Sequence, residues 1–207
     1  MCQPKKGFRF STDSVVLAQF IRERRYEKAI DIGSGSGVLA LYLARVLKCS
    51  HIDAIEIQSE LFECLVKTVE INALSEVIHT YEGDVKEFRT TTQYDLIVCN
   101  PPYRESNRGR ISQNKIKEHA KFSRFLNIDD IFTFALKYLK NSGFLYLSYD
   151  VDFMVDVIEN SRKFKLELKR MKFLHNEINK VAKLVFMEFR KNVGRELIIE
   201  PPFIQKS

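Results

Sequence analysis

Short apolar runs alternate with longer segments of helical periodicity along most of this chain, and few folds accommodate that order. Parallel strands buried on both faces read as continuous apolar runs, and a crossover helix joins each strand to the next. The alternation therefore predicts an α/β fold with a mostly parallel sheet and helices on both faces. The expected strands are Lys28–Ile32, His51–Ile57, Val77–Glu82, Tyr94–Cys99 and Gly143–Tyr149. The expected helices are Gly37–Leu47, Ser59–Asn72, Ile128–Leu139 and Val151–Asn160.

The last quarter of the chain has a different pattern. Lys165–Leu174 and Lys183–Arg190 alternate basic with apolar side chains, as strands with one buried and one solvated face do. We expect them to form an antiparallel hairpin at one edge, which makes a seven-stranded sheet. An apolar helix is expected from about Thr12. The length of 207 residues suits one domain over 1–207.

The charge of the chain is positive and unevenly distributed. The net charge is +6, residues 104–124 hold seven basic side chains against two acidic ones, and residues 161–195 hold eleven against three. This asymmetry favours a polyanion partner such as nucleic acid, although a basic surface is often only a solvated face. The stretch 104–127 also lacks periodicity, and so long a loop in a small domain is usually functional or disordered.

Composition argues against several other classes of protein. The four cysteines lie far apart with no C-x-x-C pair, and the histidines lack ligand-spaced partners, so no metal site is predicted. The longest apolar runs have the length of strands, so no membrane span is expected. No apolar stretch follows the N-terminal lysines, so no secretory signal is expected. We expect a cytoplasmic monomer.

A glycine-rich turn follows the first expected strand. It reads Asp31-Ile32-Gly33-Ser34-Gly35-Ser36-Gly37 and leads directly into a helix. A dinucleotide fingerprint needs G-x-G-x-x-G, whereas here the third glycine comes one residue early and Val38 takes its place. Asp31 would repel a pyrophosphate but suits a cation. S-adenosylmethionine carries an ammonium and a sulfonium and no phosphate, so the turn predicts this cofactor.

Two further acids stand at the ends of the next strands. Glu56 ends the second strand, where a carboxylate accepts the hydroxyls of a ribose, and Asp84 ends the third, where it can accept from an adenine amine. Ile57 and Val85 adjoin them. Strand-end carboxylates are often only turn formers or helix caps. Together with the glycine spacing, however, they predict an S-adenosylmethionine site at the carboxyl edge of the sheet.

The fourth strand runs into Asn100-Pro101-Pro102-Tyr103. Alone, this tetrapeptide is more simply a turn that ends a strand, because proline cannot continue a ladder. Beside a cofactor site it suits methylation of a planar amine or amide, whose lone pair is delocalised. The Asn100 side-chain oxygen and the Pro101 carbonyl can accept the two N–H groups of that nitrogen. Proline fixes the carbonyl in place, and Tyr103 offers a stacking face.

These motifs together resemble a known group. Residues 31–37, Glu56, Asp84 and Asn100–Tyr103 look like class I S-adenosylmethionine-dependent methyltransferases of the amino-nitrogen branch, with a Rossmann-like fold. More narrowly, Gly7–Ser14 before an apolar helix and the terminal Leu197–Pro202 resemble the bacterial valine-tRNA adenine-N6 methyltransferases. The resemblance implies an N-terminal lid and helix over 1–26, a cofactor-binding core over 27–160, and an edge hairpin with tail over 161–207.

The resemblance also implies roles for single residues. The acceptor corner is Asn100, Pro101, Pro102 and Tyr103. The cofactor contacts are Asp31, Gly33, Gly35, Gly37, Glu56, Ile57, Asp84, Val85 and Asn100, with Phe10 and Asp13 in the lid. Separately from the resemblance, the uneven charge predicts that Arg104, Arg108, Arg110, Lys115 and Lys117 hold RNA phosphates and that the basic face over 161–195 extends that contact.

The sequence therefore favours methylation of the N6 amine of an adenine in RNA, with a tRNA adenine near the anticodon as the expected target. A loop adenine is favoured because extruding it costs little. Three alternatives remain open: a protein glutamine N5-methyltransferase of the release-factor type, a ribosomal RNA or DNA amino-methyltransferase, and a binding module without turnover. The glycine spacing disfavours a nicotinamide oxidoreductase.

Overall fold

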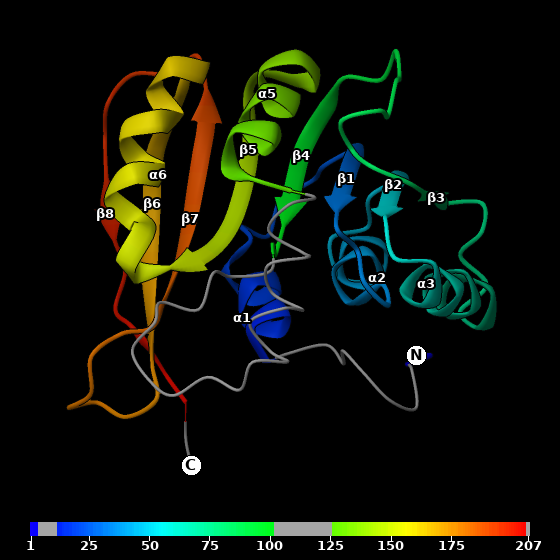
Figure 1. The fold of residues 1–207 in the computed structure, drawn as a ribbon, viewed down its shortest axis with the longest axis horizontal. Helices are drawn as coiled ribbons and strands as arrows, with labels where there is room; N and C mark the ends of the chain where they lie inside the picture. The colour runs from blue at the N-terminus through cyan, green and yellow to red at the C-terminus, as the bar shows by residue number, and fades with distance from the viewer. Residues whose placement is uncertain (4–11, 102–125, 206–207) are drawn as a thin grey trace, which may run out of the picture.

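The computed structural model describes residues 1–3, 12–101 and 126–205, and these form one sheet flanked by helices (Figure 1). The strands lie in the order β3-β2-β1-β4-β5-β7-β6-β8, and β9 pairs with β6. The larger strands are β1 (Lys28–Ile32), β2 (His51–Glu56), β3 (Ile78–Glu82), β4 (Tyr94–Cys99), β5 (Leu139–Asp150), β6 (Leu166–His175) and β7 (Leu184–Lys191). The helices of one turn or more are α1 (Thr12–Phe20), α2 (Val38–Arg45), α3 (Ser59–Ile71), α5 (Ile128–Tyr138) and α6 (Met154–Ser161), with short 3₁₀ turns at Val151–Phe153 and Arg162–Phe164.

The strand directions confirm the expected mixed sheet. β3, β2, β1, β4 and β5 are mutually parallel, and β7 runs antiparallel to both β5 and β6. Two segments of two residues each, β8 (Ile198–Ile199) and β9 (Phe203–Ile204), add to the edge by pairing with β6. These two were not predicted from the sequence, because two residues carry no periodicity.

Most element boundaries agree with the sequence to within three residues, and β5 is the exception. It begins at Leu139, directly after α5, where Gly143 was expected. Between those positions the register with β4 slips: Leu139 lies opposite Tyr94, and regular pairing resumes at Phe144 opposite Leu96. The intervening residues bulge out of the ladder, with Ser142 at a φ of 59°. The expected start therefore marks where regular pairing begins.

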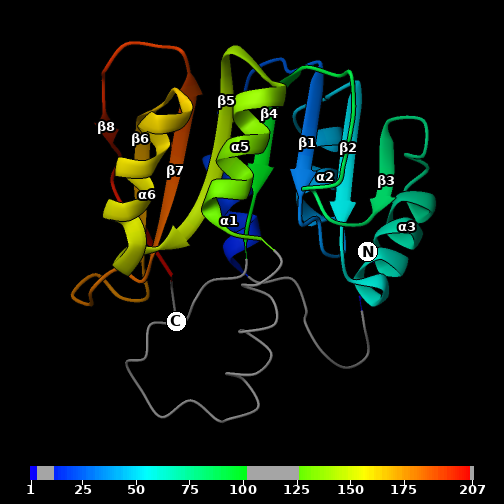
Figure 2. The same cartoon turned by 45° about the horizontal axis from the view of Figure 1, so that its top comes forward.

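Two apolar cores, one on each face of the sheet, bury the parallel strands (Figure 2). Successive side chains of a strand point to opposite faces, so Ala29 packs in one core and Ile30 in the other. Helices α1, α2 and α3 cover the first face, and α5 and α6 cover the second. The fully buried members include Leu17, Leu43, Leu65, Leu96 and Val98 on the first face, and Ile97, Phe132, Leu145, Leu147 and Met187 on the second.

The buried carboxylate of Glu188 links the segment after α1 and, through Arg170, the C-terminal tail to the sheet. Glu188 on β7 is fully buried and accepts hydrogen bonds from Arg22 Nε and Arg170 Nε, each at 2.8 Å, and from the Tyr146 hydroxyl at 3.0 Å. Arg22 follows α1, and Arg170 also pairs with Glu200 in the tail at 2.6 Å. Every charge here has a partner, as a buried ionic network requires. The network fixes α1 beneath the carboxyl ends of β4 and β5.

The parallel strands all end at one edge of the sheet. Ile32 at the end of β1 lies opposite Ile55 near the end of β2 and opposite Cys99 at the end of β4. The segments that follow β1, β2, β3 and β4 therefore start side by side. This carboxyl edge is where ligands bind in open α/β sheets.

Candidate active site

The glycine turn after β1 is held by backbone hydrogen bonds. The N–H groups of Gly33 and Ser34 both donate to the Ile55 carbonyl at 2.9 Å, and Gly37 N–H donates to the Ser34 carbonyl at 2.9 Å. Gly33, Gly35 and Gly37 have φ values of 72°, 57° and 92°. A side chain is strained in this left-handed region, so the turn needs glycine at all three positions.

Gly37 also has a packing reason to lack a side chain. A Cβ atom at this position would lie 2.8 Å from Leu65 Cδ1 on α3, so the Leu65 side chain would have to move to make room for it. The first turn of α2 thus packs directly against α3. The glycine turn is consequently a rigid loop whose backbone faces the carboxyl edge.

Asp31 is a fully buried carboxylate beneath this turn. Its Oδ2 accepts from Ala40 N–H at 3.2 Å, whereas Oδ1 has no hydrogen-bond partner among the described residues. Burial raises the pKa of Asp31 from its ordinary 3.8 to about 7. A buried acid with an unused oxygen is a site for a cation, because the cation supplies the missing interaction and stabilises the charged form.

Glu56 at the end of β2 is also buried, but both of its oxygens have partners. Oε2 accepts from Gly35 N–H and Oε1 from Gln58 N–H, each at 2.8 Å. Burial raises its pKa, and these hydrogen bonds act in the opposite direction. Glu56 therefore links the glycine turn to the start of α3 while each oxygen retains a second lone pair.

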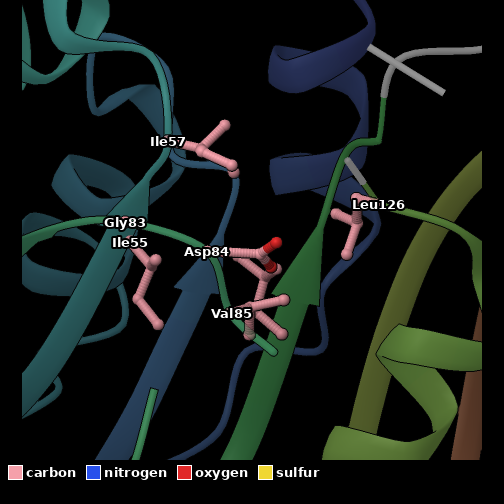
Figure 3. A pocket seen from close by; sticks show the side chains of 8 residues that line it. Ile55, Ile57, Gly83, Asp84, Val85 and Leu126 are labelled. Atoms are coloured by element: carbon pink, nitrogen blue, oxygen red, sulfur yellow. The ribbon is translucent and has the colours of Figure 1, made fainter. Parts of the chain in front are cut away.

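A hollow lies between the ends of β1, β2 and β3 (Figure 3). Its wall is mostly apolar, and Asp84 stands among the aliphatic side chains. The lining consists of Ile32, Gly33, Ile55, Ile57, Gly83, Asp84, Val85 and Leu126. The predicted contacts Ile57, Asp84 and Val85 thus come together with the start of the glycine turn. A flat apolar group with a polar edge fits such a wall.

Asp84 also has a local structural role. Its Oδ1 accepts from Lys86 N–H at 2.9 Å, and its Oδ2 pairs with Lys86 Nζ at 3.1 Å. It therefore stabilises the turn that follows β3, the simpler role that strand-end acids often have. One side chain can serve both purposes, because each carboxylate oxygen accepts more than one hydrogen bond.

Asn100 follows β4 at the same edge. Because Ile32 pairs with Cys99, the next residues along the two strands, Gly33 and Asn100, start level with each other. The Asn100 Nδ2 donates to the Ser14 hydroxyl at 2.8 Å, and its Oδ1 accepts from the Ser148 hydroxyl. Pro101 beside it is buried. The amide of Asn100 is thus held in one plane from α1 and from β5.

These two serines were not predicted from the sequence. Ser148 is fully buried within the apolar run of β5. A buried hydroxyl needs a hydrogen-bond partner, so a serine inside such a run was itself a signal. Ser14 gave no comparable signal, because a serine in the first turn of a helix is common.

Several predicted residues lie outside the described part of the chain. Asp13 is described, and it lies partly buried in the first turn of α1, one residue before Ser14. The predicted residues outside the described ranges are Phe10, Pro102, Tyr103, Arg104, Arg108, Arg110, Lys115 and Lys117.

The expected RNA contact of the basic face over 161–195 stays a prediction, and the structure shows which of its basic side chains have partners within the protein. Most of its basic side chains are engaged within the protein, because salt bridges and carbonyl contacts consume them. Arg162 pairs with Glu167, Lys169 with Glu196, and Arg170 and Lys172 with Glu200. Arg190 donates to the Ser142 carbonyl and Lys191 to the carbonyls of Leu136 and Leu139. Sequence composition counts charges, and folding decides which of them face solvent.

The described ranges contain neither a metal-binding cluster nor a helix that could span a membrane. No group of three or more His, Cys, Asp or Glu side chains in these ranges is arranged to hold a metal ion. No helix within them is long and apolar enough to cross a membrane.

Comparison with known proteins places the chain among methyltransferases. A family model for the methyltransferase small domain matches residues 9–150. The tRNA1(Val) (adenine(37)-N6)-methyltransferase of Dyadobacter fermentans is 28% identical over 201 residues, covering 96% of this chain and 82% of that protein. The enzyme of the same name from Flavobacterium psychrophilum is 27% identical, covering 95% and 86%.

Solved structures show the same fold at lower identity. A predicted O-methyltransferase from Agrobacterium tumefaciens superposes with a TM-score of 0.69 at 18% identity, covering 92% of this chain and 86% of that one. A methyltransferase from Pyrococcus furiosus gives 0.61 at 18% identity, covering 87% and 82%. The Rossmann-like fold expected from the sequence is confirmed.

The packing at Gly37 predicts a selective loss of stability. Gly37→Ala should lower the free energy of unfolding by about 1–3 kcal/mol, because the new methyl group meets Leu65 and the left-handed backbone strains it. Gly194→Ala is the control, since its added Cβ would meet nothing within 4 Å, and it should change stability by less than about 0.5 kcal/mol. Urea denaturation of both variants measures this, and equal losses would contradict the packing argument.

The buried carboxyl of Asp31 predicts a pH-dependent gain on substitution. Its raised pKa means that its stability contribution is present below pH 3.8 and is lost as the pH rises to about 7, because the charged form is disfavoured in the interior. Asp31→Asn removes this loss of stability, because the asparagine amide does not ionise. The variant should gain on the order of 2–4 kcal/mol relative to the wild type between pH 4 and pH 7, with no further gain above. Denaturation midpoints across that pH range test it, and a pH-independent difference would overturn it.

Proposed function

The chain belongs to the methyltransferase small domain family, and from this premise we propose that it transfers a methyl group from S-adenosylmethionine to the N6 amine of an adenine in RNA. A tRNA adenine beside the anticodon is the favoured target. The observation that carries the proposal is that two segments start level at the carboxyl edge. One is the glycine turn above Asp31, whose Oδ1 has no partner within the described ranges, and the other is the corner at Asn100. The names of the two bacterial relatives support the adenine target.

The residues at this edge fit S-adenosylmethionine part by part. Asp31 can attract the ammonium of the methionine part, whose charge would meet the unused Oδ1. Glu56 can accept the ribose hydroxyls on its remaining lone pairs. The apolar hollow can take the adenine ring, with Asp84 placed to accept from the ring's amine. When bound, the cofactor supplies a methyl group already activated by its sulfonium.

The acceptor corner supplies hydrogen-bond acceptors and alignment. An adenine amine is a weak nucleophile because its lone pair is delocalised into the ring. Asn100 Oδ1 and the Pro101 carbonyl can accept its two N–H groups, which turns the lone pair towards the methyl group. Contacts from Ser148 and Ser14 hold the Asn100 amide in place before the substrate arrives. Such preorganisation lowers the barrier, since little reorientation remains to be done during the reaction.

The proposed reaction makes no demand for a strong base. The methylated nitrogen would become cationic as the new N–C bond forms and the S–C bond of the donor breaks, which leaves S-adenosylhomocysteine as the product. The nitrogen would then lose a proton to solvent or to a neighbouring acceptor. A glutamine amide would meet the same two acceptors, so the corner itself does not separate the two substrates. The names of the relatives favour RNA over protein.

The proposal predicts a defined product. Purified protein, labelled S-adenosylmethionine and total RNA lacking the modification should yield labelled N6-methyladenosine, detected by nucleoside mass spectrometry. A tRNA transcript with guanine in place of adenine 37 is the control and should take up no label at that position. Label on a guanine amine, on DNA or on a protein glutamine would replace this function with one of the alternatives. Isothermal titration that detects binding of NAD but not of S-adenosylmethionine would exclude every one of these methyltransferase functions.

Removing the Asn100 side chain should separate chemistry from cofactor binding. Asn100→Ala is expected to lower kcat at least 100-fold, because one of the two acceptors for the amine is lost, while the Kd for S-adenosylmethionine changes only a few-fold. Isothermal titration gives the Kd, and single-turnover transfer gives the rate. An equal loss of both quantities would show that Asn100 acts chiefly on the cofactor.

A further inference from the structure

The basic side chains of residues 161–195 that remain available to a partner lie at the two opposite ends of the strands β6 and β7. Among the described residues, the side chains of five of the eleven have no salt bridge, hydrogen bond or ring contact: Lys163, Lys165, Lys180, Lys183 and Arg195. Lys163 and Lys165 precede β6, and Arg195 follows β7, so these three lie away from the carboxyl ends of β4 and β5. Lys180 and Lys183 lie on the connection between β6 and β7, which projects at the carboxyl edge (Figures 1 and 2).

We call that connection, residues 176–183, the hairpin tip. It also carries the two most exposed large hydrophobic side chains in the described ranges, Val181 at 80% and Ile178 at 76%. Single exposed apolar residues are common, but two on one turn beside two lysines form a surface that water solvates poorly. The tip thus joins apolar and cationic side chains at one place.

The hairpin tip is a turn held in place by hydrogen bonds. His175 Nδ1 lies 2.7 Å from the Lys180 carbonyl, and Lys180 N–H donates to the Glu177 carbonyl at 3.0 Å. Gln205 N–H from the tail donates to the His175 carbonyl at 2.9 Å, and Val151 N–H donates to the Lys183 carbonyl at 3.1 Å. These bonds anchor the tip to the end of β5 and to the tail. Its exposed side chains are therefore presented at a fixed position.

The tip lies within reach of a nucleotide chain held at Asn100. Ser148, which contacts Asn100, pairs with Phe186 on β7. Lys183 comes three residues before Phe186, which is about 10 Å along a strand, and Val181 lies further out. An RNA strand whose target base enters at Asn100 must continue past the carboxyl edge of the sheet on either side of that base. One of the possible paths passes the hairpin tip.

We propose that the hairpin tip contacts the RNA nucleotides that flank the target adenine, with Ile178 and Val181 against the faces of unpaired bases and Lys180 and Lys183 on phosphates. This inference rests on the proposed function. Unpaired loop bases offer flat apolar faces, which protein side chains cover or wedge apart, and their phosphates attract lysine. A protein partner or a second copy of the chain would use the apolar pair but has no general need of both lysines.

Two double variants separate the two kinds of contact. Ile178→Ser with Val181→Ser removes the apolar pair, and Lys180→Ala with Lys183→Ala removes the cations. The matched controls lie on α3, well away from the tip: Ile71→Ser, at a side chain 74% exposed, and Lys67→Ala, also exposed. The probe is a valine tRNA transcript carrying adenine 37, measured by fluorescence anisotropy for binding and by methyl transfer for rate.

The apolar double variant should weaken RNA binding at least fivefold and raise KM by the same factor, while kcat at saturating RNA stays within twofold. The salt dependence of its RNA affinity should match that of the wild type. The lysine double variant should also weaken binding, and it should lower the slope of log affinity against log salt by about 1.4, since each single-strand phosphate contact contributes about 0.7. Both controls should match the wild type, as should the Kd for S-adenosylmethionine in every variant.

The two readouts keep this inference apart from the proposed function. If the wild type methylates the transcript and both tip variants bind it as the controls do, the tip assignment fails and the function stands. If the transcript binds in a tip-dependent way but no methyl group is transferred, the tip assignment stands and the function fails. A wild-type dimer that the apolar double variant converts to monomer, with RNA affinity unchanged, would identify the tip as a self-contact and overturn the assignment.

Discussion

The hydrogen bonds that pair β1 with β4 determine the geometry of the whole carboxyl edge. Ile32 lies opposite Cys99, so the glycine turn and the Asn100 corner leave the sheet at the same level. A slip of one residue would move every side chain of β4 to the other face and would turn Asn100 away. Both strands are buried on both faces, in two separate cores, and this burial makes such a slip costly. The packing of the core therefore positions the two segments that carry the proposed reacting groups.

The two buried acids at this edge show how stability and binding compete. Glu56 has a backbone donor on each oxygen and so contributes to the local structure. Asp31 has one oxygen with no hydrogen-bond partner among the described residues and a pKa raised to about 7, so its charged form is disfavoured in the protein alone. A bound cation would offset that cost, because it favours the charged carboxylate. Residues that destabilise the free protein in this way are typical of ligand sites, where the binding partner completes the set of interactions.

The sequence was sufficient for the elements whose signal is local. Strands β1 and β4 were predicted to the residue, because each is a short apolar run bounded by charged or turn-forming residues. The start of β5 was missed, since its first residues bulge out of the ladder and only the register with β4 shows this. The site residues at strand ends were placed because parallel strands end together, whereas the contacts of Ser14 and Ser148 with Asn100 depend on α1 and β5 meeting beside β4. These two contacts join residues 86 and 48 positions apart in the chain, and no short sequence window spans them.

Charge composition was the least reliable guide, and the reason is physical. A lysine or arginine is costly to leave unpaired near the interior, so the folded chain used Arg170, Lys172 and Lys191 to satisfy carboxylates and carbonyls. The side chains that remain for a partner are the ones that no internal acceptor can reach, and these gather where the backbone turns away from the sheet. At the hairpin tip the turn also leaves Ile178 and Val181 without apolar neighbours to cover them. Charge and apolar surface are thus exposed together at that point, beside the edge where the proposed chemistry takes place, and these two properties are the basis on which we propose a single-stranded nucleic acid as the partner of the tip.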